Sequence, residues 1–366
     1  MNSYELILFV ISLFAIIEII LKFDNKEYLL TVCLYWVFVA VLICFAGLRT
    51  VGADLENYAS IYKVLQSPNS WNDWTVVTLE PAFKLLFSLL KTTNFQTALF
   101  VTATIAVFLK ATFLKKYSPY PILSLAIYFT SIFIIKEMGQ IRHGVAMGII
   151  LWSFDALFQN NKKRFLILVV TAILFHWSAF CVLPLYFFAN RTIPSYLYGI
   201  FLAVILAIVF LNLTAVIANI IDLVPIAGLE GRANMYLKGN GQFSEKIGIN
   251  STFILLIVVM AVMLIFRKKL TEKYPYFDNV INIYFLGIFY FGFFNSISEF
   301  AQRLTIYFRM IDMLVLPMII SVFRFEKILI GVLLCFNSFW TLKKYENSGI
   351  GKYFFPYESI INKKMK

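Results

Sequence analysis

A charged segment between two apolar stretches carries residue types suited to phosphate binding and proton transfer. Residues 136–146 read KEMGQIRHGVA, which sets Lys136, Glu137, Arg142 and His143 close together. Ionisable groups beside membrane-spanning helices are costly, so they must face water, a partner or a ligand. This pattern is typical of a phosphate clamp or a general base. An ordinary interfacial turn, whose long side chains extend to the headgroup region, is the alternative.

The composition excludes a water-soluble globular protein. Hydrophobic residues make up 61% of the 366 residues and charged residues only 14%, whereas soluble domains carry about 25% charged residues. The apolar runs at 7–21, 29–48, 95–109, 196–211 and 253–266 approach or reach the length of a helical membrane span. The first run lacks a basic start and a small-residue cleavage site, so we expect a retained helix.

These patterns predict an all-α polytopic membrane protein with roughly ten to twelve transmembrane helices and some short or re-entrant ones. We expect one transmembrane domain over residues 1–366. The net charge of +12 is spread through short loops and the tail, which fits anchoring at the cytoplasmic side and argues against nucleic-acid binding. The four cysteines lie inside apolar runs without the spacing of a metal site or a disulfide framework.

Basic clusters predict which side each loop occupies. Those at 22–26, 115–116, 162–164 and 267–269 mark the inside. Residues 49–93 then form an outer loop with a short helix, Pro81–Leu90, that cannot cross the membrane. Pro81 suits the first helical turn, and Glu80 at its positive end either caps the helix or takes part in catalysis. Residues 212–251 form a second outer loop that could act as a lid.

Three further segments complete this topology. Residues 165–188 must begin and end inside, so we expect two short helices that meet near His176 at the tip. A core histidine that hydrogen-bonds across helices is the alternative role of His176. Glu299 and Arg303 are expected at an outer turn before a helix over 304–323. Parity places the tail 343–366 outside while its lysines argue for inside, so its side stays open.

The predicted topology collects a cation-rich set of residues at the outer face: Arg49, Asp54, Glu80, Lys136, Glu137, Arg142, His143, Arg232, Glu299 and Arg303, with His176. Guanidinium groups bind phosphate oxygens in a bidentate manner and stay charged, so several arginines suit a diphosphate and stabilise it as a leaving group. The sequence has no His-Glu-x-x-His, Asp-x-Asp or Asp-Asp motif. Metal-dependent sugar transfer is therefore disfavoured, and we expect no cofactor.

A hydroxyl acceptor would still need a base. His176, His143, Glu80 and Glu137 are the candidates if the buried setting perturbs them. For Arg232 and Arg303 the alternative is a salt bridge to Glu230 and Glu299, which the short spacings permit.

A series of short motifs runs along the chain, and the first covers residues 48–58 (LRTVGADLENY). In order follow Glu80–Phe83, Ile141–Ala146, Phe175–Ala179, Arg232 with Tyr236, Arg303 with Tyr307, and Pro356–Tyr357. Residues 48–58 look like the first signature of the EpsG-like branch of the Wzy-type polysaccharide polymerases, and the later motifs resemble those of the same branch. Their order and spacing over nearly the whole chain make the resemblance fairly specific. Relatives commonly have glutamine where His143 stands, so no catalytic role is carried onto it.

The resemblance implies a GT-C-like, metal-independent glycosyltransferase of the bacterial inner membrane, in the class of O-antigen polymerases of lipopolysaccharide biosynthesis. Such an enzyme moves a growing glycan from undecaprenyl diphosphate onto the non-reducing end of an incoming lipid-linked repeat unit at the periplasmic face. Its partners would be the lipid-linked donor and acceptor, membrane lipid and a chain-length regulator protein.

By the same likeness Arg142, Arg232, Arg303 and Arg49 would hold the diphosphate. His176 or a carboxylate, Glu80 or Glu137, would assist the acceptor hydroxyl, and Asp54 with Tyr58 would shape the sugar site. Tyr236 and Glu299 are further substrate-binding candidates.

Two other functions compete with this reading. An O-antigen ligase shares the donor and chemistry and differs in its acceptor. A flippase or transporter of lipid-linked oligosaccharides would carry charges through the bilayer midplane and often an internal repeat, and the sequence shows no repeat.

Overall fold

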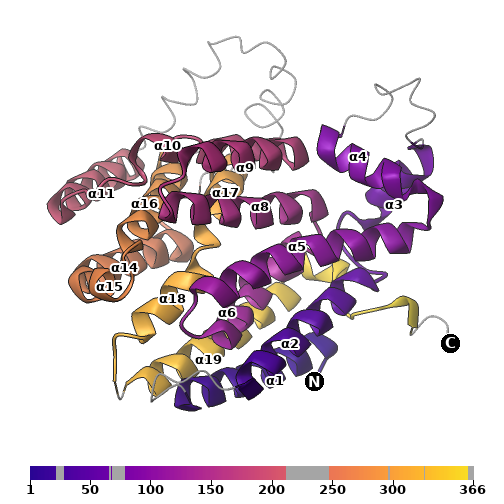
Figure 1. Ribbon diagram of the computed structural model, residues 1–366, viewed down its shortest axis with the longest axis horizontal. Coiled ribbons are helices and arrows are strands. Elements are labelled where there is room, and N and C mark those ends of the chain that lie inside the picture. The colour runs from indigo at the N-terminus through magenta and orange to yellow at the C-terminus, as the bar shows by residue number, and fades with distance from the viewer. Residues whose placement is uncertain are drawn as a thin grey trace, which may run out of the picture. The chain divides into compact units, whose positions relative to one another are not determined.

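The computed structural model describes residues 1–21, 29–65, 67, 79–211, 247–295, 297–324 and 326–361, and every regular element within these ranges is helical (Figure 1). Four of the described helices are long and apolar enough to cross a membrane by length and composition. They are α1 (Ser3–Leu21), α2 (Leu29–Gly47), α5 (Phe95–Tyr117) and α8 (Ile141–Phe158). The predicted all-α architecture with several apolar helices is confirmed.

The remaining described elements are shorter or less apolar. They are α3 (Leu55–Val64), α4 (Pro81–Leu89), η3 (Leu90–Thr92), α6 (Pro121–Tyr128), η4 (Phe129–Phe133), α7 (Ile134–Lys136), α9 (Lys162–Phe175), η5 (Trp177–Val182), α10 (Leu185–Phe188), α11 (Ser195–Phe210), α14 (Ser251–Ile265), α15 (Arg267–Lys273), α16 (Phe277–Phe293), α17 (Ser298–Arg309), α18 (Asp312–Ile320), α19 (Lys327–Glu346) and η6 (Gly351–Tyr353). Helix α4 is about 14 Å long at 1.5 Å per residue, so it cannot cross a membrane, as predicted.

Internal contacts divide the chain into two compact units. The first unit holds Met1–Ala156, Lys163–Phe180 and Asp312–Lys366, and the second holds Leu157–Lys162 and Cys181–Ile311. All four long apolar helices lie wholly or mainly in the first unit. The expected single domain over residues 1–366 stays a prediction.

In the first unit the two ends of the chain pack together. Helix α1 packs against α6 and α19, and α2 packs against α5 (Figure 1). The tail pairs with the segment after α2, because the backbone N–H of Thr50 donates to Glu358 O (2.9 Å) and that of Ile360 to Leu48 O (3.0 Å). The tail therefore lies at the same end of the first unit as Arg49. The charge pattern alone had left the side of the tail open.

The apolar segment before the charged cluster is not a uniform helix. Between α6 and α7 the chain makes a π-helical turn, Phe129–Phe133. Such turns insert one extra residue and re-aim the side chains that follow. This interruption leads directly into Lys136 and Glu137.

The predicted break at His176 is confirmed. Helix α9 ends at Phe175, and η5 begins at Trp177. In the second unit the side-chain amide of Asn190 donates to Leu157 O (2.9 Å) and to Asn160 Oδ1 (3.0 Å). The residues that follow the 165–188 segment therefore lie beside the residues that precede it.

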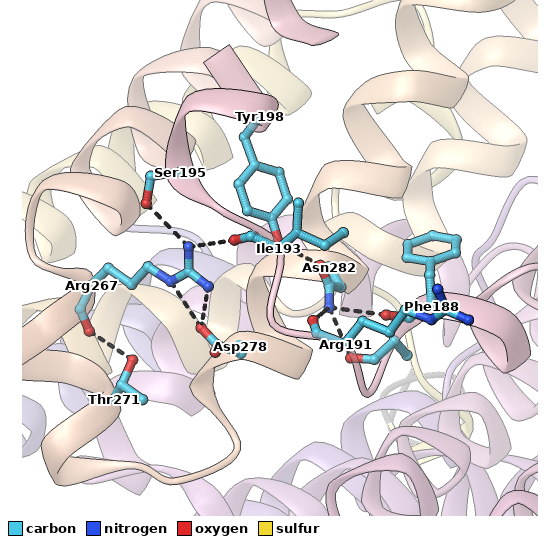
Figure 2. A network of polar contacts seen from close by, with 10 residues as sticks. Phe188, Arg191, Ile193, Ser195, Tyr198, Arg267, Thr271, Asp278 and Asn282 are labelled. Atoms are coloured by element: carbon cyan, nitrogen blue, oxygen red, sulfur yellow. Dashed lines mark hydrogen bonds and ion pairs between the residues drawn. The ribbon is translucent and has the colours of Figure 1, made fainter. Parts of the chain in front are cut away.

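A polar network in the second unit ties the loop after α10 to the start of α15 (Figure 2). The Arg267 guanidinium contacts Asp278 (2.9 Å) and donates to Ile193 O (2.7 Å). The Asn282 amide donates to three backbone carbonyls, those of Phe188, Ala189 and Arg191. Arg191 and the basic run 267–269 therefore lie at one end of the second unit, as the charge pattern predicts.

The outer turn expected at Glu299 and Arg303 is wrong. Both residues lie on α17, and the chain breaks later, at Met310 and Ile311 before α18. Polar residues at 299 and 303 are one helical turn apart, and the opposite face buries Ala301, Leu304, Thr305 and Phe308. This amphipathic spacing favours a helix over a turn. Most of the expected outer loop 212–251 lies outside the described residues, and α14 begins at Ser251.

Candidate functional site

An aromatic cluster fixes the first turn of α8 in place. It is made of the buried side chains Tyr58, Tyr62, Leu65, Phe83, Phe87, Ala98, Leu99 and Ile141, from α3, α4, α5 and the first residue of α8. Each fully buried phenylalanine stabilises such a cluster by about 1.5–3 kcal/mol. The Tyr62 hydroxyl also donates to Leu90 O (2.7 Å), which holds α3 on the end of α4. The short helices α3 and α4 are therefore anchored directly beside Arg142.

Arg142 is held on one side and open on the other. Its Nη1 contacts Glu80 Oε2 at 2.5 Å, and its Nε donates a long bond to the Tyr58 hydroxyl at 3.4 Å. The guanidinium carbon lies 5.8 Å from the centre of the Tyr58 ring. The side chain of Arg142 keeps 29% of its surface exposed. A guanidinium has several N–H donors in a planar fork, so the exposed edge of the Arg142 guanidinium can bind an anion.

Glu80 does not cap α4. It occupies the N-cap position before Pro81, but its side chain makes no capping hydrogen bond. The carboxylate is directed to Arg142 instead, so the capping alternative for Glu80 is wrong. The contact with Arg142 occupies the carboxylate and favours a role in holding the guanidinium.

Tyr58 and Asp54 complete this cluster. Burial raises the pKa of Tyr58, the positive charge of Arg142 lowers it in part, and the charge of Asp54 raises it further. The phenol is therefore neutral at working pH and can donate or accept a hydrogen bond. Asp54 precedes Tyr58 by one helical turn and has no capping bond from its side chain. The structure thus brings Asp54, Tyr58, Glu80 and Arg142 together.

The two histidines of the chain stack on each other beside this cluster. Their ring centres are 4.5 Å apart, and the rings are inclined by 16°. Lys136 Nζ lies 3.1 Å from His143 Nδ1. Because an ammonium group can only donate, it favours the neutral form of His143 with Nδ1 as acceptor. His176 is half-buried, and its Nδ1 lies 2.7 Å from Ser178 Oγ, a local contact within its own turn.

Glu137 is buried away from the surface. Its side chain has no exposed area and pairs with Lys110 Nζ at 2.9 Å. The Tyr128 hydroxyl donates to the same carboxylate oxygen at 2.6 Å. Sequence reasoning missed Lys110 and Tyr128. A signal for Lys110 existed, since a lysine within an apolar helix is by itself evidence of a special role.

Arg49 binds backbone in this structure. It is 1% exposed, and its guanidinium donates to Met138 O (3.0 Å) and to Ala46 O. Burial lowers the pKa of Arg49 to about 10, so the group still carries its charge at neutral pH. Arg49 therefore joins the end of α2 to the turn before α8, and its binding of a diphosphate stays a prediction.

The loop that carries Arg49 depends on a glycine and on the tail. Gly52 has φ +147°, and a Cβ there would lie 2.3 Å from Met138 O, so only glycine permits this close approach. The Tyr357 ring stacks on Phe45 with centres 3.8 Å apart, and its hydroxyl donates to Phe45 O (3.0 Å). Burial raises the pKa of Tyr357 to about 12. The tail thus covers the end of α2 with a neutral aromatic side chain.

The remaining candidates belong to the second unit or lie outside the described residues. Arg303 Nε donates to Glu299 Oε1 at 2.5 Å, with the two side chains 36% and 30% exposed. The salt bridge considered for this pair is confirmed. Arg232 and Tyr236 lie outside the described residues. The convergence of Arg142, Arg232 and Arg303 in one pocket stays a prediction.

Comparison with known proteins identifies the family. No curated protein and no solved structure matches the chain significantly. The sequence model of the EpsG family matches residues 32–359, nearly the whole chain. This range includes Arg49, Glu80, Arg142, His176 and Tyr357. Membership indicates a polysaccharide polymerase-like membrane protein with glycosyltransferase-like chemistry. The chain therefore belongs to the EpsG family.

Proposed function

We propose that this protein is a surface-polysaccharide polymerase, of the O-antigen type, that joins undecaprenyl-diphosphate-linked repeat units. A hydroxyl at the non-reducing end of the acceptor attacks the anomeric carbon of the donor glycan. The bond between that carbon and the diphosphate oxygen breaks, and the diphosphate leaves with the electron pair. The enzyme is of the GT-C type, needs no metal and acts at the periplasmic face of the bacterial inner membrane.

The observation that carries the proposal is the open edge of Arg142. A guanidinium held by Glu80 and Tyr58 is oriented before a ligand arrives, so it loses little entropy on binding. Donors placed where negative charge builds up stabilise the transition state more than the ground state. Arg142 is therefore assigned to the departing diphosphate, with Arg232 and Arg303 as further ligands.

His176 is the proposed base for the acceptor hydroxyl. It is half-buried, and it stacks on the residue that follows Arg142 in sequence. A neutral imidazole takes up a proton near pH 7. Glu80 and Glu137 are less suited because each is ion-paired. Half-buried Asp54 lies on the neighbouring surface where the sugar would lie, and buried Tyr58 supports that surface from beneath.

The charge distribution supports the orientation. The end of α8 far from Arg142 is followed by a basic run, 162–164, and α5 ends on Lys115 and Lys116. Basic residues concentrate on the cytoplasmic side of membrane proteins. The first turn of α8 then faces the periplasm.

The test is a reaction of purified full-length protein in lipid with lipid-linked repeat units, extracted from producing cells that lack this chain. We expect glycans of increasing repeat number on the lipid diphosphate, with release of undecaprenyl diphosphate, in the presence of a chelator. The products are separated by size and by lipid anchor.

Each alternative gives a different product. Transfer of one finished glycan to lipid A core would identify a ligase. Movement of the lipid-linked substrate across the bilayer without a new bond would identify a flippase. Activity that is lost on chelation and restored by a divalent cation would contradict the arginine-based mechanism.

A further inference from the structure

A buried polar contact joins four segments of the first unit just behind the first turn of α8. Lys110 of α5 pairs with Glu137 Oε1 at 2.9 Å and donates to Gly144 O at 2.5 Å. Tyr128 of α6 donates to the same Glu137 oxygen at 2.6 Å. Neither Lys110 nor Glu137 has any exposed side-chain surface. The four groups therefore belong to the interior and do not touch a ligand at the surface.

Stability alone gives little reason for charges at this place. Ionised groups within membrane helices are expensive. Apolar side chains of similar volume often replace a buried ion pair without loss of stability. This pair does something that apolar side chains cannot: Lys110 donates to the Gly144 carbonyl of α8 and pairs with Glu137, so it fixes the direction of a backbone carbonyl and of a carboxylate.

Gly144 allows the carboxylate to lie against the helix. A Cβ at this position would be 2.3 Å from Glu137 Oε2 and 3.2 Å from Lys136 O. Oε2 has no hydrogen-bond partner among the residues that the structure describes, so packing on Gly144 is what locates it. Arg142 lies two residues earlier in the same helical turn. The Lys110–Glu137 pair thus contacts the buried side of this turn at Gly144, while Glu80 and Tyr58 contact the side chain of Arg142.

We propose that the Lys110–Glu137 pair, packed on Gly144, is a positioning element for Arg142. It sets the orientation of the first turn of α8, so that the guanidinium meets the diphosphate in the geometry of the transition state. Glu137 then acts through Arg142 and is not the general base. The inference rests on the proposed polymerase function, because the effect is read in that reaction.

The experiment compares variants of the full-length protein in lipid, with lipid-linked repeat units as substrate. Gly144→Ala keeps both charges and displaces the carboxylate. Lys110→Met/Glu137→Gln removes both charges at similar volume, which avoids a single buried charge. Gly199→Ala is the matched control, since a Cβ at this helical glycine meets nothing within 4 Å. The measurements are the melting temperature, kcat, KM and the pH dependence of kcat.

We expect kcat to fall about tenfold or more in Gly144→Ala and in the double variant, because a 1 Å misplacement of a catalytic group costs up to about 100-fold. KM for the donor should change less than about threefold. The pH profile should keep its shape, and the melting temperature of the double variant should stay near that of the wild type. Gly199→Ala should behave as the wild type.

Normal kcat in both variants would overturn the proposal. A pH profile that loses its acidic limb in the double variant would also overturn it, since Glu137 would then be the base. Unfolding of both variants would assign the pair to stability and equally overturn it. A wild-type protein that makes no polymer would instead remove the proposed function itself, which separates the two failures.

Discussion

Two clusters of charged and aromatic side chains lie at opposite ends of α8, and they are built in opposite ways. In the first turn, partly exposed Arg142 is bound by Glu80 and by the ring of Tyr58. In the last turn, about 20 Å away along the axis, Asp155 is fully buried. It accepts hydrogen bonds from Lys116 (2.5 Å) and Tyr117 and forms an ion pair with Arg164 (2.9 Å).

The difference lies in which charge is central. At Asp155 the carboxylate is inside and its cations are outside, with side chains 43% and 40% exposed. Both cations also lie over the Trp152 ring. The central charge is satisfied, so this cluster joins α5, α8 and α9 and has nothing left to bind. At Arg142 the central charge is the cation, and part of its fork is open. We infer that the first cluster serves binding and the second serves stability.

The largest effect should come from the open cation. Arg142→Ala removes the donor that we assign to the diphosphate, and loss of one such donor costs about 10²–10³ in kcat. We expect long-chain polysaccharide to disappear while single repeats still reach the surface lipid. Arg142→Lys should retain partial activity because it keeps charge without the bidentate fork. Gel analysis of the glycan and kcat measurement check both.

The matched control for this prediction is Arg164→Ala at the other cluster. It removes an arginine with a carboxylate partner and an aromatic neighbour, but at the end that we assign to stability. Chain length should stay normal. Normal chain length in Arg142→Ala would refute the role of Arg142, and a loss in both variants would erase the distinction between the clusters.

A smaller effect on a different quantity is expected at the closed cluster. Asp155→Asn removes a buried charge that orients Lys116 and Arg164, and hydrogen bonds to charged groups contribute about 1.5–3 kcal/mol each. We expect a lower melting temperature with kcat per folded molecule nearly unchanged, because the exposed cations can turn to water. Glu272→Gln, at an exposed carboxylate of α15, is the control for charge removal. A loss of kcat at normal stability would show that the closed cluster has a catalytic role.

The sequence predicted local features well and long-range pairing poorly. Apolar runs and basic clusters located the long helices, the short helix at Pro81 and the break at His176, since hydropathy and charge act locally. The site of Glu80 beside Arg142 depends on packing of α3, α4 and α5, which no periodicity encodes. The pairing of Lys110 with Glu137 and that of the tail with Leu48 likewise depend on tertiary packing. The missed helix at Glu299 was readable, because its polar and apolar residues follow the helical period.

The smallest expected effect concerns Tyr58, and it tests how Arg142 is held. Tyr58→Phe keeps the ring under the guanidinium and removes a hydroxyl whose hydrogen bond is long at 3.4 Å. We expect kcat to fall less than about fivefold, because this bond is longer than an ordinary hydrogen bond and Glu80 still holds the guanidinium. Burial raises the pKa of Tyr58 above its usual value near 10. The phenol is therefore protonated throughout the neutral range, and the pH profile of the variant should overlay that of the wild type.

An alkaline limb that disappears in Tyr58→Phe would show that the hydroxyl itself transfers a proton. A loss as large as that of Arg142→Ala would show that Tyr58 contacts the substrate.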